Sequence, residues 1–218
     1  MNETIFDPIR LSIEVSLTAE VFIVCLGLWI GQWIARSRKS VRNVIVETVL
    51  MLPLVLPPTV VGFILIIVFG KNSPIGQVIE WVFHQPIIFT FWAAVIAATV
   101  VAFPLMLQSV KTGIEGIDQD IEDAARMDGA NEWKLFIFVT IPLASRAIVT
   151  GAILGFARAL GEFGATLMFA GNIPTKTQTI PTAIYVAIDT GHMSIAWILV
   201  ITTVIISFIM LLVTYVLR

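Results

Sequence analysis

Charge and cysteine are both scarce in this sequence, and the two shortages define its class. Charged residues make up 13% of the 218 residues, hydrophobic residues make up 58%, and the mean hydropathy is +0.96. Soluble globular chains carry about 25% charged residues. Cys25 is the single cysteine, which excludes an internal disulfide, and its place inside an apolar run predicts a small packing residue. The composition therefore predicts an integral membrane protein.

Motifs for nucleotide and metal chemistry are also missing. The sequence contains no G-x-x-x-x-G-K-[ST] loop to cradle phosphates and no spaced Cys/His cluster. His84 and His192 fall in predicted connections between apolar runs, where a lone histidine is usually solvated. We therefore expect no catalytic residue, cofactor or metal site, and any ATP hydrolysis must belong to another chain.

Long apolar runs are what the sequence has in abundance. A helix rises about 1.5 Å per residue, so about 20 apolar residues cross the hydrocarbon core. The runs predict an all-α polytopic protein that forms one domain over residues 1–218. Five spans are expected, over residues 11–35, 48–69, 87–110, 139–160 and 193–217. Segment 161–191 has only two short apolar pieces, and we expect a loop there that can dip into the membrane.

The second run contains three prolines, Pro53, Pro57 and Pro58. Each removes a backbone donor, so this segment is predicted to kink. A kink can serve helix packing alone, or it can line or gate a pathway, and the sequence leaves both open.

Charged residues inside apolar runs are costly unless they are paired or wet. Arg158 and Glu162 stand four residues apart, which favours an ion pair on one helix face. The alternative is that Arg158 gives an anion pathway a positive potential.

Two other classes of protein also stay open. An ion-coupled secondary transporter or channel would use Arg158 and Glu162 with Glu14 and Glu20 as a relay, and a membrane scaffold would use none of them.

Basic residues are unevenly divided between the two predicted sides of the membrane. One side carries Arg36, Arg38, Lys39, Arg42, Lys111, Arg126, Lys134 and Arg218, and the other carries Arg10, Lys71 and Lys176. Basic connections stay in the cytoplasm. The distribution therefore predicts an external N-terminus, a cytoplasmic C-terminus and a cytoplasmic connection over residues 111–138.

That connection is the one long amphiphilic interruption of the sequence. Asp118 can cap a short helix whose first turn is acidic, and Gly129 can close the helix in the left-handed conformation. Asn131 can start a second helix. Ala124 and Ala125 leave a low surface that lets the backbone of another protein approach closely. The pattern indicates a docking surface, and the alternative is an ordinary amphipathic connector.

The order of residues here resembles the cytoplasmic signature loop of permease subunits of binding-protein-dependent ABC importers. That motif is an acid, two alanines, three residues, a glycine, nine residues, an aliphatic, any residue, an aliphatic and proline. The matching positions are Asp123, Ala124, Ala125, Gly129, Val139, Ile141 and Pro142. The departures are aspartate for glutamate at 123 and isoleucine for leucine at 141.

Two further segments closely resemble the molybdate permease subunits of these importers. They are residues 56–63, LPPTVVGF, and residues 159–185, which begin with ALGEFGATLMFAGNIP. With the signature loop, the likeness extends from about Pro8 to the end of the chain. Relatives that carry sulfate or tungstate share much of this framework.

The resemblance implies a type I ABC importer permease fold in a bacterial or archaeal cell membrane, with the loop 111–138 as its coupling region. It also implies a homodimer of permeases, two cytoplasmic ATP-binding subunits, an external oxyanion-binding protein and no nucleic-acid partner. The coupling residues would be Asp123, Ala124, Ala125, Gly129 and Pro142. Candidate pathway or gate residues are Pro57, Pro58, Thr59, Arg158, Glu162 and Gly164.

Overall fold

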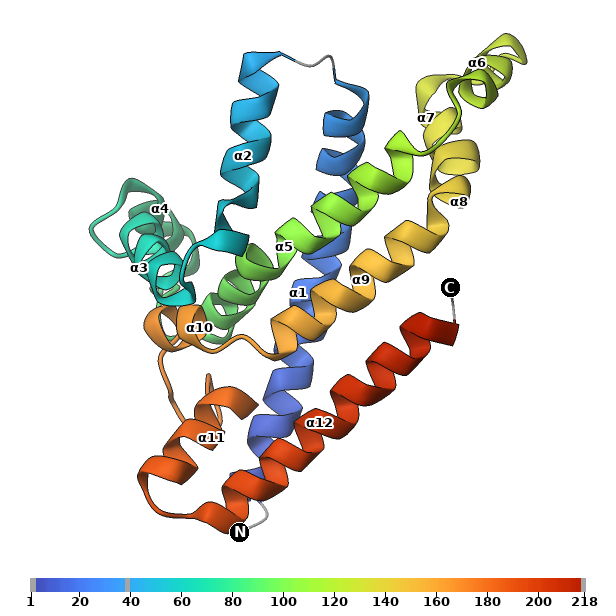
Figure 1. Ribbon diagram of the computed structural model, residues 1–218. Coiled ribbons are helices and arrows are strands. Elements are labelled where there is room, and N and C mark those ends of the chain that lie inside the picture. Colours follow the sequence, from blue (N-terminus) through green and yellow to red (C-terminus); the bar gives the residue numbers. More distant parts are fainter. Residues whose placement is uncertain (1–2, 38–39, 217–218) are drawn as a thin grey trace.

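The computed structural model describes residues 3–37 and 40–216, and every regular element within these ranges is a helix (Figure 1). Arg38, Lys39 and Arg218, which entered the charge argument, lie outside the described residues. The elements are α1 (Glu3–Arg36), α2 (Val41–Val55), α3 (Pro58–Phe69), α4 (Pro74–Phe83), α5 (Phe91–Glu115), α6 (Gln119–Met127), α7 (Glu132–Leu135), the π-helix η1 (Phe136–Thr140), α8 (Ile141–Leu143), α9 (Ser145–Leu160), α10 (Gly164–Phe169), α11 (Ile180–Asp189) and α12 (Met193–Val216). The all-α prediction is confirmed.

The number of membrane crossings depends on how two bent helix pairs are counted. Within the described residues, α1, α5 and α12 are each long and apolar enough to cross a membrane alone. Two bent pairs can each be counted as one further crossing. One pair is α2 with α3, and the other is the helical segment 132–143 with α9, which gives up to five crossings. The chain is therefore multi-pass, and the prediction of five spans stands only on this way of counting.

Helix α5 packs against both α1 and α9, which also contact each other (Figure 1). Of its apolar window, 72% is buried, against 28% for α1 and 11% for α12. Glycines let the helices approach closely. A Cβ on Gly27 would lie 2.5 Å from Met106 Cγ, and one on Gly151 would lie 2.7 Å from Ser109 Cβ. Small residues at such crossings allow the close packing that holds membrane helices together.

The predicted single helix over residues 48–69 is wrong, although its kink is confirmed. Helix α2 ends at Val55, α3 begins at Pro58, and their axes differ by 119°. Leu56 and Pro57 each precede a proline, which disfavours helical geometry, and both are extended, with ψ of 144° and 135°. Pro58 can then open α3, because a residue in the first turn needs no hydrogen-bonded N–H.

The predicted span over residues 139–160 is also broken. The chain is already helical at Glu132, widens into η1, and turns by 75° before Ser145 opens α9. Pro142 lies in the short α8 at this bend. Its ring nitrogen cannot donate to the preceding turn, and π-helical turns and proline are the usual causes of sharp kinks.

The other predicted boundaries move by a few residues. Helix α1 begins at Glu3, before residue 11, and Cys25 on this helix is exposed, so it does not pack in the core of this chain. Helix α5 begins at Phe91, where Thr90 caps it, and runs to Glu115. Helix α12 agrees with the last predicted span as far as the described residues extend.

Segment 161–191 contains two short helices, α10 and α11, neither long enough to cross a membrane. The N-terminus of α11 is held against α1, because the Ile180 amide donates to the buried Ser12 hydroxyl at 2.7 Å. Figure 1 shows α11 at the end of the molecule opposite α6 and α7.

Candidate functional site

The helix caps predicted for the coupling loop are confirmed. The Asp118 carboxylate accepts from the Asp120 amide at 3.1 Å, and Asn131 Oδ1 accepts from the Lys134 amide at 2.8 Å. Gly129 has a φ of +88°, and the next amide, Ala130, donates to the Ala125 carbonyl at 3.1 Å. This closure is the turn that only glycine enters without strain. It sets the direction of α7 relative to α6.

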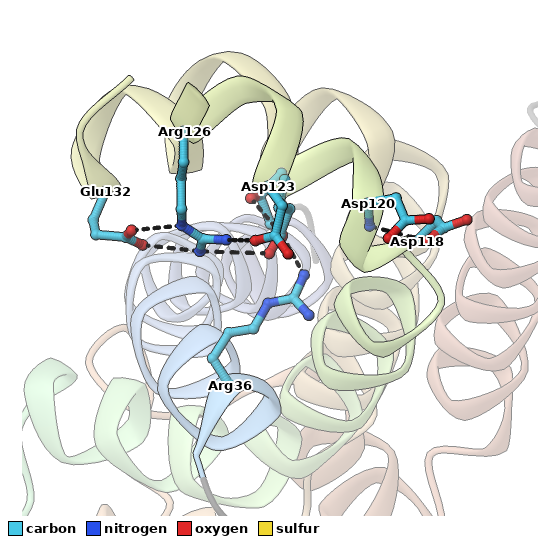
Figure 2. Close-up of polar contacts among 8 residues, drawn as sticks. Arg36, Asp118, Asp120, Asp123, Arg126 and Glu132 are labelled. Atoms are coloured by element: carbon cyan, nitrogen blue, oxygen red, sulfur yellow. Dashed lines mark hydrogen bonds and ion pairs between the residues drawn. The ribbon is translucent and has the colours of Figure 1, made fainter. Parts of the chain in front are cut away.

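Arg126 joins the two sides of this turn (Figure 2). Its Nε lies 2.9 Å from Glu132 Oε1 and its Nη1 lies 2.8 Å from Asp123 Oδ1. Hydrogen bonding from Arg126 lowers the pKa of the Glu132 carboxyl. The hydrogen bond with Glu132, and to a smaller extent the one with Asp123, raises the pKa of the Arg126 guanidinium. Asp123, the acid of the signature motif, therefore pairs within the loop and remains exposed.

The outer face of α6 combines small and apolar side chains. Ala124 is exposed and Ala125 is half-buried. Met127 is 89% exposed, and Trp133 on α7 is 70% exposed. Exposed apolar side chains beside small residues on a helix are what a partner groove buries. Pro142, the last residue of the motif, is exposed at the bend that joins this loop to α9.

The sequence did not reveal the role of Glu122. In the sequence this residue is one of the acidic residues in the first turn of the predicted helix, but its side chain is buried and pairs with Arg36 at the end of α1. The Thr140 hydroxyl of η1 also donates to Glu122, at 3.3 Å. No spacing rule connects residues 86 positions apart, so no signal in the sequence could have paired Glu122 with Arg36.

The structure brings three of the predicted gate residues, Pro58, Thr59 and Gly164, into contact. A Cβ on Gly164 would lie 3.0 Å from Pro58 Cβ and 3.3 Å from the Thr59 amide nitrogen. The break at Pro57 therefore directs the start of α3 onto the start of α10. One turn further along α3, a Cβ on Gly62 would lie 3.0 Å from both Cα and O of Ala165. The two helices thus pack backbone against backbone.

The predicted ion pair between Arg158 and Glu162 is confirmed, with Arg158 Nη1 2.8 Å from Glu162 Oε2. The other carboxylate oxygen accepts from the Ala165 amide at 2.8 Å, so buried Glu162 connects the end of α9 to the start of α10. Gly164 lies between these two contacts. Five of the six candidate gate residues, Arg158, Glu162, Gly164, Pro58 and Thr59, therefore lie along one series of contacts from α9 through α10 to α3, and Pro57 directly precedes Pro58.

The remaining charges in the apolar runs are dispersed. Glu14 pairs with Arg10 at 2.7 Å, and Glu47 pairs with Lys111. Both carboxylate oxygens of Glu20 are buried and receive no hydrogen bond from the described residues, and they lie beside Gly155 of α9. A secondary transporter would need a connected relay of charged residues. The structure does not join Glu14, Glu20, Arg158 and Glu162 into one network of ion pairs.

A cavity of about 530 Å³ lies between α1, α4 and α5. Its walls are aromatic and aliphatic side chains with Gln85, Thr90 and Thr99, and none of its described lining residues is charged. Such walls would penalise a dianion, so this cavity is not the place for an oxyanion. Across the described residues, no group of three or more His, Cys, Asp or Glu side chains could hold a metal ion.

Several apolar helices that can cross a membrane, joined by an exposed amphiphilic loop, are typical of the transmembrane subunit of a transporter. The chain belongs to the family described as the binding-protein-dependent transport system inner membrane component, whose model matches residues 23–218. It is therefore a multi-pass cell-membrane permease subunit and not an enzyme in its own right. The kinds of partner that such a system uses are a substrate-binding protein and ATP-binding subunits.

Similar proteins are known from several bacteria. The chain is 59% identical over 206 residues to YvgM of Bacillus subtilis (strain 168), provisionally named a molybdenum transport system permease protein, and the match covers 94% of this chain and 90% of the relative. It is 40% identical over 186 residues to the molybdenum transport system permease protein ModB of Escherichia coli (strain K12), with 85% and 80% covered.

Solved structures agree with the fold. A bacterial ABC transporter that imports the polysaccharide alginate has a TM-score of 0.77 at 13% identity, covering 99% of this chain and 79% of that one. The inward-facing MetNI methionine ABC transporter has a TM-score of 0.71 at 15% identity, covering 98% and 94%. These likenesses confirm the ABC importer permease fold.

Proposed function

We propose that this chain is the permease subunit of an ATP-driven importer for an oxyanion, most specifically molybdate. The observation that carries the proposal is the 40% identity, over 85% of the chain, to a permease named for molybdenum transport. Identity of 59% to the Bacillus subtilis relative supports the same substrate. Tungstate and sulfate are the alternatives within the family, since these tetrahedral dianions have the same charge and similar size.

In this proposal two copies of the chain enclose the pathway, because the described residues make at most five crossings, too few to surround it alone. Each copy docks one ATP-binding subunit through the coupling residues, and an external binding protein delivers the oxyanion to the opposite end. The coupling residues are Asp123, Ala124, Ala125, Gly129 and Pro142. The exposed face formed by Ala124 and Met127 supports this assignment.

Helix α9 connects the docking loop to the gate and transmits movement from one to the other. Its 16 residues extend about 24 Å at 1.5 Å per residue. One end follows the bend at Pro142, and the other end carries Arg158 and leads to Glu162. Closure of the ATP-binding subunits would move α6, and the bent connection would tilt α9.

The gate lies where α10 meets α3, at Pro57, Pro58, Thr59 and Gly164. Tilting of α9 reaches α10 through Glu162, whose side chain accepts from the Ala165 amide. Because α10 and α3 touch backbone to backbone, a small shift of α10 must separate them or carry α3 along. Arg158 offers positive charge near this position, although Glu162 compensates it.

Substrate identity is tested by deleting the gene. We expect the deletion strain to lose high-affinity uptake of radiolabelled molybdate and the activity of its molybdenum-dependent enzymes. Excess molybdate in the medium should restore those enzymes, because other oxyanion importers admit molybdate weakly. If molybdate uptake is unchanged while tungstate or sulfate uptake falls, the substrate assignment is wrong and the family stands.

Topology gives a second prediction. A reporter fused after residue 218 should be cytoplasmic, and one inserted near Ser73 should be external, because basic connections stay in the cytoplasm. The pairing of Arg36 with Glu122 supports one shared side for the connection after α1 and the coupling loop. Labelling of Arg42→Cys, in a Cys25→Ser background, by an impermeant external reagent would contradict this orientation.

A further inference from the structure

Glu122 is the only buried residue of α6, a helix that the structure describes in full. Its side chain is 3% exposed, whereas the side chain of neighbouring Asp123 is 64% exposed. A carboxylate taken out of water needs charged or hydrogen-bonding partners. The inner face of α6 is therefore attached to the rest of the molecule by a charge and not by an apolar side chain.

The partners of Glu122 come from α1 and η1. Arg36, in the last turn of α1, forms an ion pair with Glu122 Oε1, and the Thr140 hydroxyl donates to the same oxygen. Arg126 Nη2 lies 3.8 Å from the other oxygen. Figure 2 shows Arg36 extending from α1 toward α6. The end of α1, the middle of α6 and η1 therefore meet at one carboxylate.

The Glu122 contact determines which helices a movement of α6 can displace. The chain itself joins α6 to α5 on one side and, through η1, to α9 on the other. Helix α1 has no such covalent link to α6, and it packs along both α5 and α9. The Glu122 contact adds α1 as a third connected helix, so a displacement of α6 can be passed to α1 as well as to α5 and α9.

We propose that Glu122 is a positioning residue for transport. With Arg36 and Thr140, it clamps α6 to the end of α1, so that a partner docked on the exposed alanine face moves α1 together with α9. This inference rests on the proposed coupling role of α6. Breaking the clamp leaves Ala124, Ala125 and Gly129 in place for docking but separates α1 from the movement.

The test compares variants of the clamp with a matched ion pair. Glu122→Gln keeps the side-chain shape without its charge, Arg36→Met removes the cation, and the double variant removes both. Glu47→Gln is the control, because the Glu47–Lys111 pair joins α2 to α5 without contacting α6. The measurement is molybdate uptake per ATP hydrolysed by the complete complex in lipid vesicles.

We expect that ratio to fall about tenfold in each single clamp variant. Arg36→Met leaves the buried Glu122 carboxylate without its cation, and Glu122→Gln leaves Arg36 without the carboxylate that holds it against α6. The double variant should transport better than the product of the single effects predicts, since no unpaired charge remains. Glu47→Gln should stay within about twofold of the wild type, as is usual for partly exposed ion pairs. Unchanged ratios in both single variants, or strictly multiplicative effects, would overturn the proposal.

A spectroscopic measurement separates this inference from the proposed function. Spin labels at Trp33→Cys on α1 and Met127→Cys on α6, in a Cys25→Ser background, report the distance between the two helices in the permease alone. The clamp predicts a narrow distribution of label distances when Glu122 is present and a broad one in the Glu122→Gln variant. Equal distributions in the two proteins would overturn the proposal. A wild-type complex without ATP-driven uptake would instead contradict the proposed function, and the label distances would still decide the clamp.

Discussion

Uptake should fall to background when Gly129 is replaced by valine, while the chain remains in the membrane. Gly129 has a φ of +88°, where a β-branched residue is strained by about 1–3 kcal/mol. A Cβ would meet no atom within 4 Å, so the cost comes from the backbone and not from a clash. The turn can relieve this strain only by redirecting α6 relative to α7. We expect ATP-binding subunits to co-purify poorly with this variant.

Gly191→Val is the matched control for that experiment. Gly191 has a φ of +76°, a Cβ there would also meet no atom within 4 Å, and the residue lies in the turn between α11 and α12. Valine should impose similar strain there and leave co-purification normal. Ala125→Glu tests the docking surface without touching the turn, by adding bulk and charge. Normal co-purification and uptake in both Gly129→Val and Ala125→Glu would show that the loop is only a connector.

The second large effect is expected from Gly62→Ala, which should separate α3 from α10. The new Cβ would lie 2.7 Å from Met168 Cβ and 3.0 Å from Cα and O of Ala165. Backbone atoms cannot move aside as a flexible side chain can, and overpacking of this kind costs about 1–3 kcal/mol. We expect a lower unfolding temperature of the purified permease and loss of uptake, because the proposed gate can no longer close.

Two other alanine substitutions calibrate this result. Gly164→Ala meets Pro58 and Thr59 at 3.0 to 3.4 Å and should have an intermediate effect. At Gly161 a Cβ would lie 3.6 Å from the Ala157 carbonyl, an ordinary contact, so Gly161→Ala should behave like the wild type. If all three variants unfold and transport alike, close packing of α3 on α10 is not needed for gating.

Features that depend on near neighbours in the chain could be predicted from the residues alone. Hydropathy identified the apolar helices, because the length needed to cross a bilayer follows from the helical rise. Asp118, Gly129 and Asn131 were predicted as caps, and each takes that role, since capping involves residues within about one turn. The same locality explains the confirmed pair of Arg158 and Glu162, which are four residues apart.

Which distant residues meet, and how far the helices bend, became known only from the packing of the helices in space. Prolines predicted a kink in the second run, but its 119° angle and the close packing of α3 on α10 at Gly62 and Gly164 are known only from the structure. Glu122 could not be paired with Arg36 from the sequence, because the two residues lie 86 positions apart and no local spacing rule relates them. Such contacts depend on how α1, α5 and α9 approach one another, and the chain between two residues does not encode that approach locally.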